Sequence, residues 1–387
     1  MLRIRTDTIG CVITSLLFMI CFYPAAVLEK IGIVQIGLSA VWMFYILVEL
    51  IWGRKGITFY DVIFVFIVFT VLKSGVSNDS LYEAIRFIGR TLLPIFVVKY
   101  ILSSNRLNHR KAFLYTLCGY FLVECLINTI WMLLSPSDLT GINSYFLGGD
   151  NSAANTYFMS IFMAYLVYEI SGNRKALILS IANMLLFTVR LQIASSVTWI
   201  AGFIVFAILY LKKDGYKAIK LNILLIIYGI VCVLLLTISI TSIAPYIDLF
   251  FYGKSVSLSH RMELWRYFLE LVKEQPLWGY GPTKLEYRDM IENLAKWKAV
   301  GNCHNIVLEI AYRYGLMTLV PVALSIIKCN SQRTVFQKQH VFIGAFVYLV
   351  LLHGLSEIGF SVLAFYLPFY FYSDKIIEIL QVEQEIS

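Results

Sequence analysis

Arginines and one histidine at the edges of apolar stretches are the residues of this chain best suited to chemistry. Arg86 and Arg90 stand four residues apart, so one helix face would carry both like charges. Because such charges repel unless an anion lies between them, we expect this pair to bind an anion. Arg190 ends a later apolar run, and Arg261 and His304 bracket the one long loop. Guanidinium forks bind oxyanions such as pyrophosphate bidentately, and an imidazole suits proton transfer near neutral pH.

Two glutamates lie inside apolar runs, where an ionisable group is costly and needs a partner. Glu309 precedes Arg313 by four residues, so the two side chains would meet and neutralise each other on one helix. We expect Glu124 to join two helices through a partner such as an arginine.

The composition indicates that these residues belong to a membrane protein. Hydrophobic residues make up 59% of the 387 residues and charged residues 14%, whereas a soluble globular chain carries roughly 25% charged residues. About twelve membrane spans of about 20 residues would need about 240 residues, so little chain remains for soluble domains. We therefore predict an all-α polytopic integral membrane helix bundle of about 12 transmembrane helices. One long outer loop would contain amphipathic helices.

Charge, cysteines and motifs exclude other classes of protein. The net charge is +8, but Lys and Arg occur in short runs between apolar stretches, so we expect no nucleic-acid partner. The seven cysteines form no CxxC pair, which predicts neither a disulfide framework nor a zinc site. The chain has no P-loop, GxGxxG, GxSxG or HExxH motif. Any catalysis must therefore use groups at the outer face or inside the bundle, and we expect no metal or cofactor.

Positive charges set the expected topology. Apolar runs predict spans at residues 9–28, 31–52, 57–73, 82–102, 112–135, 152–171, 176–191, 192–211, 221–247, 303–327, 340–355 and 357–373. Short loops on the side of the N-terminus are rich in Lys and Arg, whereas the opposite short loops hold only Lys30 and Lys73, so both termini are expected in the cytoplasm. The expected parts are about nine N-terminal transmembrane helices (1–247), an outer loop (248–302), about three C-terminal transmembrane helices (303–373) and a cytoplasmic tail (374–387).

The outer loop carries two helical patterns. One apolar stripe consists of Leu258, Met262, Trp265, Leu269 and Val272, and Pro276 ends it. A second stripe consists of Tyr287, Met290, Leu294 and Trp297. We expect two amphipathic helices at the outer membrane interface.

Three segments around this loop carry a family resemblance. They are SHRMELW (259–265), QPLWGYG (275–281) and HNIVLE (304–309), followed by Gly315. In this order they resemble the O-antigen ligase/polymerase superfamily of bacterial envelope glycosyltransferases, over about residues 185–320. Upstream, the segment GGDNS (148–152) is similar to polymerase members.

The resemblance implies a metal-independent, inverting glycosyltransferase whose donor is an undecaprenyl-pyrophosphate-linked glycan. Arg261 and His304 match two essential family positions and are the expected catalytic residues. At a third position ligases typically carry Ser-Arg-Gly, where this chain reads Ala-Ser-Ser-Val over 194–197. Arg190, or alternatively Arg86 and Arg90, could do that work. Five residues are expected to contact the substrate: Arg190, Arg86, Arg90, Asn305 and Glu309.

We therefore predict a polymerase of O-antigen or capsular repeat units in the bacterial cytoplasmic membrane. Its partners would be the lipid-linked glycan, membrane lipid and a chain-length regulator protein. The first alternative is the ligase that transfers finished polymer to lipid A core. A transporter of lipid-linked glycan is disfavoured, because charged residues concentrate at the outer interface and no internal repeat is found.

Overall fold

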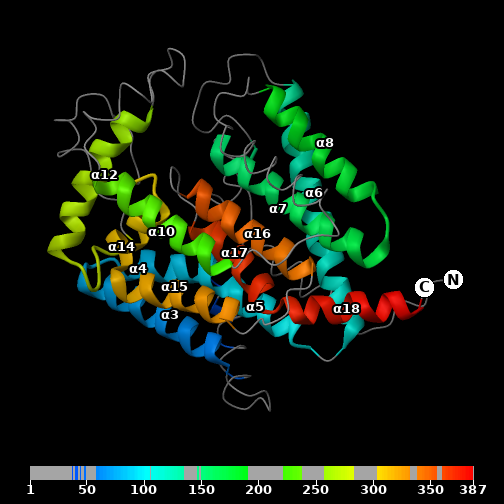
Figure 1. The fold of residues 1–387 in the computed structure, drawn as a ribbon, viewed down its shortest axis with the longest axis horizontal. Helices are drawn as coiled ribbons and strands as arrows, with labels where there is room; N and C mark the ends of the chain where they lie inside the picture. The colour runs from blue at the N-terminus through cyan, green and yellow to red at the C-terminus, as the bar shows by residue number, and fades with distance from the viewer. Residues whose placement is uncertain are drawn as a thin grey trace. The chain divides into compact units, whose positions relative to one another are not determined.

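The described chain is helical, as the sequence predicts. The computed structural model describes residues 37, 40–41, 44, 48, 58–104, 106–134, 146–147, 150–190, 221–237, 257–282, 303–331, 338–354 and 360–386. Within these ranges the regular structure is helical, with no strand (Figure 1). The elements are α3 (Phe59–Ser77), α4 (Leu81–Phe87), the π-helical turn η2 (Ile88–Leu92), α5 (Leu93–Leu102), α6 (Leu107–Leu134), α7 (Asp150–Ser171), α8 (Lys175–Arg190), α10 (Leu221–Thr237), α12 (Ser257–Glu274), α14 (Ile306–Tyr314), α15 (Leu316–Ser331), α16 (Lys338–His353), α17 (Phe360–Phe371) and α18 (Ser373–Ile386).

The helices fall into two compact units. The first unit contains α5, α6, α7, α8, α18 and the part of α17 from Ala364 onward. The second unit contains α3, α4, α10, α12, α14, α15 and α16.

In the first unit, α6 packs along α7 and α8. Its core includes the ring of Phe365, which meets the Phe121 ring edge to face with centroids 5.4 Å apart. Buried polar groups also join the helices: the Tyr157 hydroxyl on α7 lies 2.9 Å from the Thr129 hydroxyl on α6. The Asn128 side chain donates to the same Tyr157 oxygen over 3.2 Å. Apolar packing and satisfied polar groups together fix the register of α6 against α7.

The C-terminal residues form a helix, α18, where the sequence analysis expected only a tail. Ile376, Ile377 and Ile379 are buried, and α18 packs against α6 and α7. From α6, Arg110 Nη1 donates to the Lys375 carbonyl over 2.9 Å and to Glu378 Oε2 over 2.8 Å. The cytoplasmic location of this helix stays a prediction.

In the second unit, α14 is the central element, since it packs against α3, α12 and α15. α3 begins with a capping box in which the Thr58 amide donates to Asp61 Oδ2 over 2.7 Å. Further along α3, the Thr70 hydroxyl lies 2.6 Å from the Thr318 hydroxyl of α15. The Thr70–Thr318 contact holds α3 beside α15.

Apolar side chains cover outward faces of the described helices. On α3 the exposed side chains include Val62, Val65 and Phe69, which return at helical spacing, and on α6 they include Val123 and Ile127. Such continuous apolar faces suit lipid rather than water. Among the described residues, α3 and α6 are long and apolar enough to cross a membrane. These helices indicate an integral membrane protein, and the expected number of about 12 spans stays a prediction.

Two predicted spans are not single continuous α-helices. The span expected over 303–327 is two helices, α14 and α15, which meet at Gly315. The span expected over 82–102 runs through α4, η2 and α5, and its π turn precedes Pro94. Pro94 lacks an amide hydrogen, so the regular α-helical hydrogen-bond pattern is interrupted near this point. The spans expected at 9–28 and 192–211 lie outside the described residues.

Candidate functional site

The first predicted loop helix is confirmed as α12, which ends at Glu274, shortly before Pro276. Trp265 and Val272 of the expected stripe are buried, and Phe268 extends the buried face. This face packs on α14 through a cluster that includes Cys303, Leu308 and Tyr312. The side chains of Leu258 and Met262, and the whole second stripe, lie outside the described residues.

After α12, the PLWGYG segment (residues 276–281) lies against the end of α14. Its Tyr280 amide donates to the Tyr312 carbonyl over 2.8 Å, and its Gly281 amide donates to the Arg313 carbonyl over 2.8 Å. In return, the Leu316 amide donates to the Pro276 carbonyl over 2.8 Å. The segment therefore pairs with the α14–α15 junction through backbone hydrogen bonds.

Three glycines make this close approach possible. Gly279 and Gly315 both have positive φ angles, of 65° and 73°, and a Cβ atom at either position would overlap a backbone carbonyl of the facing segment. At Gly281, with φ 85°, a Cβ atom would lie 2.6 Å from Ser80 Oγ. The glycines of the family-like pattern thus have a structural cause, because L side chains fit neither this backbone nor this space.

Tyrosine side chains add to the same contact. The rings of Tyr280 and Tyr312 stack with their centroids 5.2 Å apart, and Phe268 of α12 meets Tyr312 edge to face at 4.9 Å. Burial and the neighbouring Glu274 carboxylate raise the pKa of Tyr280 to about 12. The phenol therefore stays protonated at neutral pH and donates to Glu274 Oε2 over 2.7 Å.

His304 occupies an unusual backbone conformation directly before α14. Its φ angle is 48°, in the left-handed region, which costs non-glycine residues on the order of 1–3 kcal/mol. The residues on both sides hold it there. Trp265 Nε1 donates to the Cys303 carbonyl over 2.8 Å, and the Asn305 side chain caps α14 by accepting the Leu308 amide over 3.0 Å. His304 is partly exposed.

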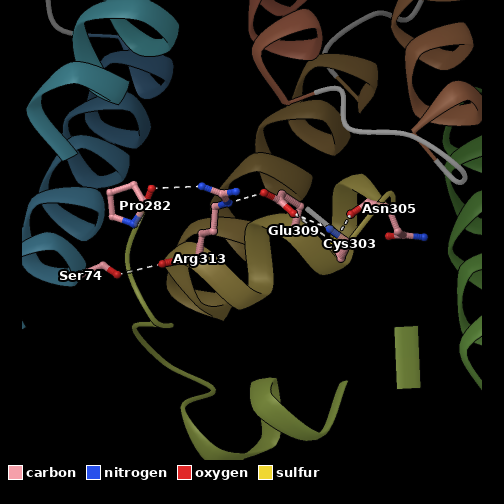
Figure 2. A network of polar contacts seen from close by, with 6 residues as sticks. All are labelled: Ser74, Pro282, Cys303, Asn305, Glu309 and Arg313. Carbon is pink, nitrogen blue, oxygen red and sulfur yellow. Dashed lines mark hydrogen bonds and ion pairs between the residues drawn. The ribbon is translucent and has the colours of Figure 1, made fainter. Parts of the chain in front are cut away.

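A polar network continues from Cys303 along α14 (Figure 2). Glu309 Oε2 accepts the Cys303 amide over 3.1 Å, and Glu309 Oε1 accepts Arg313 Nε. Arg313 Nη1 reaches the Pro282 carbonyl over 3.1 Å, and the Arg313 carbonyl accepts the Ser74 hydroxyl over 2.8 Å. The predicted Glu309–Arg313 ion pair is confirmed.

The other expected site residues belong to four different elements. Arg261 lies on α12 one helical turn before Trp265 and, like Arg86 in the last turn of α4, belongs to the second unit. Arg190 ends α8, and Arg90 lies in η2, both in the first unit. The side chains of Arg90, Arg190 and Arg261 lie outside the described residues. The expected placement of Arg86 and Arg90 on one helix face assumes a regular α-helix between them. Because η2 is π-helical, that assumption does not hold.

Two further expectations concern buried side chains. Asn305 is fully buried, and its side-chain oxygen serves the cap of α14, so any contact of Asn305 with a substrate stays a prediction. Glu124 is buried in α6, and its Oε1 atom has no hydrogen-bond partner among the described residues. The arginine partner expected for Glu124 is not found in that part of the chain.

Sequence reasoning missed three features of the site. The apolar stripe does not reveal that the Trp265 indole nitrogen bonds the carbonyl before His304. The spacing of Glu309 and Arg313 does not reveal that the Arg313 fork also reaches Pro282. The spacing of glycines at 279, 281 and 315 was a usable signal of a close backbone contact. In the described ranges, no group of three or more His, Cys, Asp or Glu side chains is placed to hold a metal ion.

Comparison with known proteins gives one match. Residues 176–323 match a family model described as O-antigen ligase. The matched region begins in α8, ends in α15 and includes α12, the PLWGYG segment and His304. It supports the predicted resemblance to the ligase/polymerase superfamily, and with it a role in polysaccharide assembly that uses lipid-linked glycan. No curated protein matches the chain.

Proposed function

We propose that this protein polymerises lipid-linked oligosaccharide repeat units into O-antigen or capsular polysaccharide at the outer face of the bacterial cytoplasmic membrane. The donor is a growing glycan on undecaprenyl pyrophosphate, and the acceptor is the non-reducing sugar of a new lipid-linked unit. The match over residues 176–323 supports this class of reaction. The polymerase is favoured over the ligase because residues 194–197 depart from the Ser-Arg-Gly pattern of ligases and residues 148–152 are similar to polymerase members.

In the proposed reaction an acceptor hydroxyl oxygen attacks the anomeric carbon of the donor sugar. The bond from that carbon to the pyrophosphate oxygen breaks with inversion, and the hydroxyl proton passes to the His304 imidazole. Arg261 stabilises the negative charge that develops on the leaving pyrophosphate. Because an arginine supplies this positive charge, the reaction is proposed to be metal-independent. Turnover of the purified protein in excess EDTA is the corresponding test.

The hydrogen bond between Trp265 and the Cys303 carbonyl is the observation that carries this assignment. It fixes α12 beside the residue that precedes His304 in the chain. Arg261 lies four residues before Trp265, which is about 6 Å along a helix axis. The bond therefore supports a site that draws on both α12 and the segment around His304, although the two are far apart in sequence.

The remaining assignments follow from the same proposal. A second arginine, either Arg190 or the Arg86 and Arg90 pair, would share the pyrophosphate with Arg261. Asn305 and Glu309 would contact the acceptor sugar or hold His304 in place. Both chain termini would lie in the cytoplasm, and a chain-length regulator protein would be a partner.

The ligase is the second candidate, because the matching family model is described as O-antigen ligase. The glycan profile of a strain that lacks this protein separates the two functions. Loss of a polymerase leaves lipopolysaccharide or capsule with single repeats, whereas loss of a ligase leaves free lipid-linked polymer. An unchanged glycan profile would refute both.

A further inference from the structure

Pro282 and Cys303 both contact one ion pair, Glu309–Arg313. The described chain reaches Pro282 and resumes at Cys303. Arg313 Nη1 donates to the Pro282 carbonyl over 3.1 Å, and Glu309 Oε2 accepts the Cys303 amide over 3.1 Å (Figure 2). One pair of side chains on α14 thus contacts both Pro282 and Cys303.

The pair is built into the core of the second unit. The Glu309 and Arg313 side chains retain only 6% and 18% of their exposure. The Arg313 backbone is held as well, since its carbonyl accepts both the Ser74 hydroxyl and the Gly281 amide. A charge buried in this way is costly once its partner is removed, so the two side chains depend on each other.

The same pair acts on the conformation of His304. Glu309 Oε2 accepts both the amide and the thiol of Cys303, the latter over 3.2 Å. Glu309 thus holds the residue before His304, and the Asn305 side chain caps the helix that follows it. A non-glycine residue persists in the left-handed region only when its surroundings over-determine it, and these bonds supply that constraint.

We propose that Glu309 and Arg313 form a positioning clasp, which anchors Pro282 and Cys303 and orients His304 for glycan transfer. This inference rests on the proposed function of His304. The clasp residues are positioning residues rather than groups that touch the reacting atoms. When the clasp is broken, Cys303 leaves its buried position and His304 loses its orientation. The maximum rate should therefore fall more than the affinity for the donor.

Cys303 is a built-in probe of the clasp, because its side chain is fully buried and its thiol bonds Glu309. N-ethylmaleimide labelling of the full-length protein in membranes, resolved by peptide mass spectrometry, reports Cys303 separately from the other cysteines. The first variant is Glu309→Gln, which removes the charge but keeps the shape. The second is Arg313→Lys, which keeps the charge but replaces the guanidinium fork by a single nitrogen that cannot bond Glu309 and Pro282 in the same way. The matched control is Glu270→Gln on α12, whose ion pair with Lys273 is exposed.

Both clasp variants should label at Cys303 about tenfold faster than the wild type. A buried donor without its partner destabilises the arrangement in which the Cys303 thiol is buried. With purified protein and lipid-linked repeats, their kcat should fall about tenfold while KM changes by less than about twofold. Glu270→Gln should leave labelling and turnover unchanged. His304→Ala should abolish turnover and leave Cys303 protected.

Unchanged Cys303 labelling in both clasp variants would overturn the proposal. So would faster labelling with a normal kcat, because the clasp would then hold Cys303 without orienting His304. These results differ from failure of the proposed function, in which the wild-type protein itself shows no transfer to lipid-linked acceptors. Arg313→Lys retains the ion-pair charge, so it keeps the test informative if Glu309→Gln does not fold.

Discussion

At the scale of single residues, replacing the guanidinium fork of Arg261 tests whether this arginine binds substrate or only balances charge. In Arg261→Lys the positive charge remains, but the bidentate grip on a pyrophosphate is lost. One charge-assisted hydrogen bond contributes about 1.5–3 kcal/mol, which corresponds to a rate loss of about 10- to 150-fold. We expect Arg261→Lys, and equally His304→Ala, to accumulate unpolymerised repeats, as measured by glycan gel profiles.

Arg266 on the same helix is the matched control for this experiment. It is exposed on α12, so Arg266→Lys should give normal polymer. Equal membrane abundance of all variants must be verified by immunoblot. Wild-type chain length in Arg261→Lys at equal abundance would assign this arginine to charge balance alone.

The indole of Trp265 gives a second prediction at this scale. Trp265→Phe keeps an aromatic ring in the buried face but removes the donor to the Cys303 carbonyl. A buried acceptor without a partner costs about 1–3 kcal/mol, and the loss should appear as a lower thermal midpoint of the detergent-solubilised protein. Trp278→Phe is the control, because Trp278 is only partly buried and meets Phe69 through its ring. Equal thermal midpoints for the two variants would show that the Trp265 bond contributes nothing to stability.

At the scale of elements, the break between α14 and α15 depends on Gly315. Backbone strain and steric overlap can be distinguished by comparing two glycines with similar φ angles. Gly315 has φ 73° and faces the Leu277 carbonyl, whereas Gly172 at the end of α7 has φ 68° and open space around it. Gly172→Ala should cost about 1–2 kcal/mol from backbone strain alone. Gly315→Ala should cost about 2–5 kcal/mol, because overpacking adds to the strain.

Denaturant titration of both variants in detergent, followed by tryptophan fluorescence, measures this difference. Comparable midpoints for Gly315→Ala and Gly172→Ala would mean that the PLWGYG segment moves away at little cost. Its hydrogen bonds to α14 would then be unimportant for stability. Failure of Gly315→Ala to accumulate in the membrane, with normal Gly172→Ala, would agree with the prediction.

Helix positions could be predicted from the sequence wherever the apolar pattern is local. The expected spans at 57–73 and 112–135 correspond closely to α3 and α6, and the stripe around Trp265 marks α12. Hydropathy does not predict the break at Gly315, because it averages over that position and the break is caused by a contact with Leu277, far away in sequence. The capping role of Asn305 is local by contrast, because its side chain accepts the amide of Leu308, three residues later.

At the scale of the whole molecule, the region that matches the family concentrates in the second unit. α12, the PLWGYG segment, α14 and α15 all belong to that unit, and so does His304. Arg90 and Arg190 belong to the first unit. Sequence spacing predicted which residues are suited to this chemistry, but which of them act together depends on tertiary contacts that spacing does not contain.

Membrane topology is the last prediction, because it decides whether Arg261 and His304 can share a face with the donor. Positive charges of the short loops lie mostly on one side, so reporters fused after Lys111, Lys175 and Lys213 should be cytoplasmic. A reporter near Lys284 should be outside. Alkaline phosphatase, which is active only outside, and green fluorescent protein, which is fluorescent only inside, should therefore give opposite patterns at Lys175 and Lys284. Active phosphatase at Lys175 would place that loop on the opposite side of the membrane from the one expected. It would also remove the physical basis for placing pyrophosphate at Arg261.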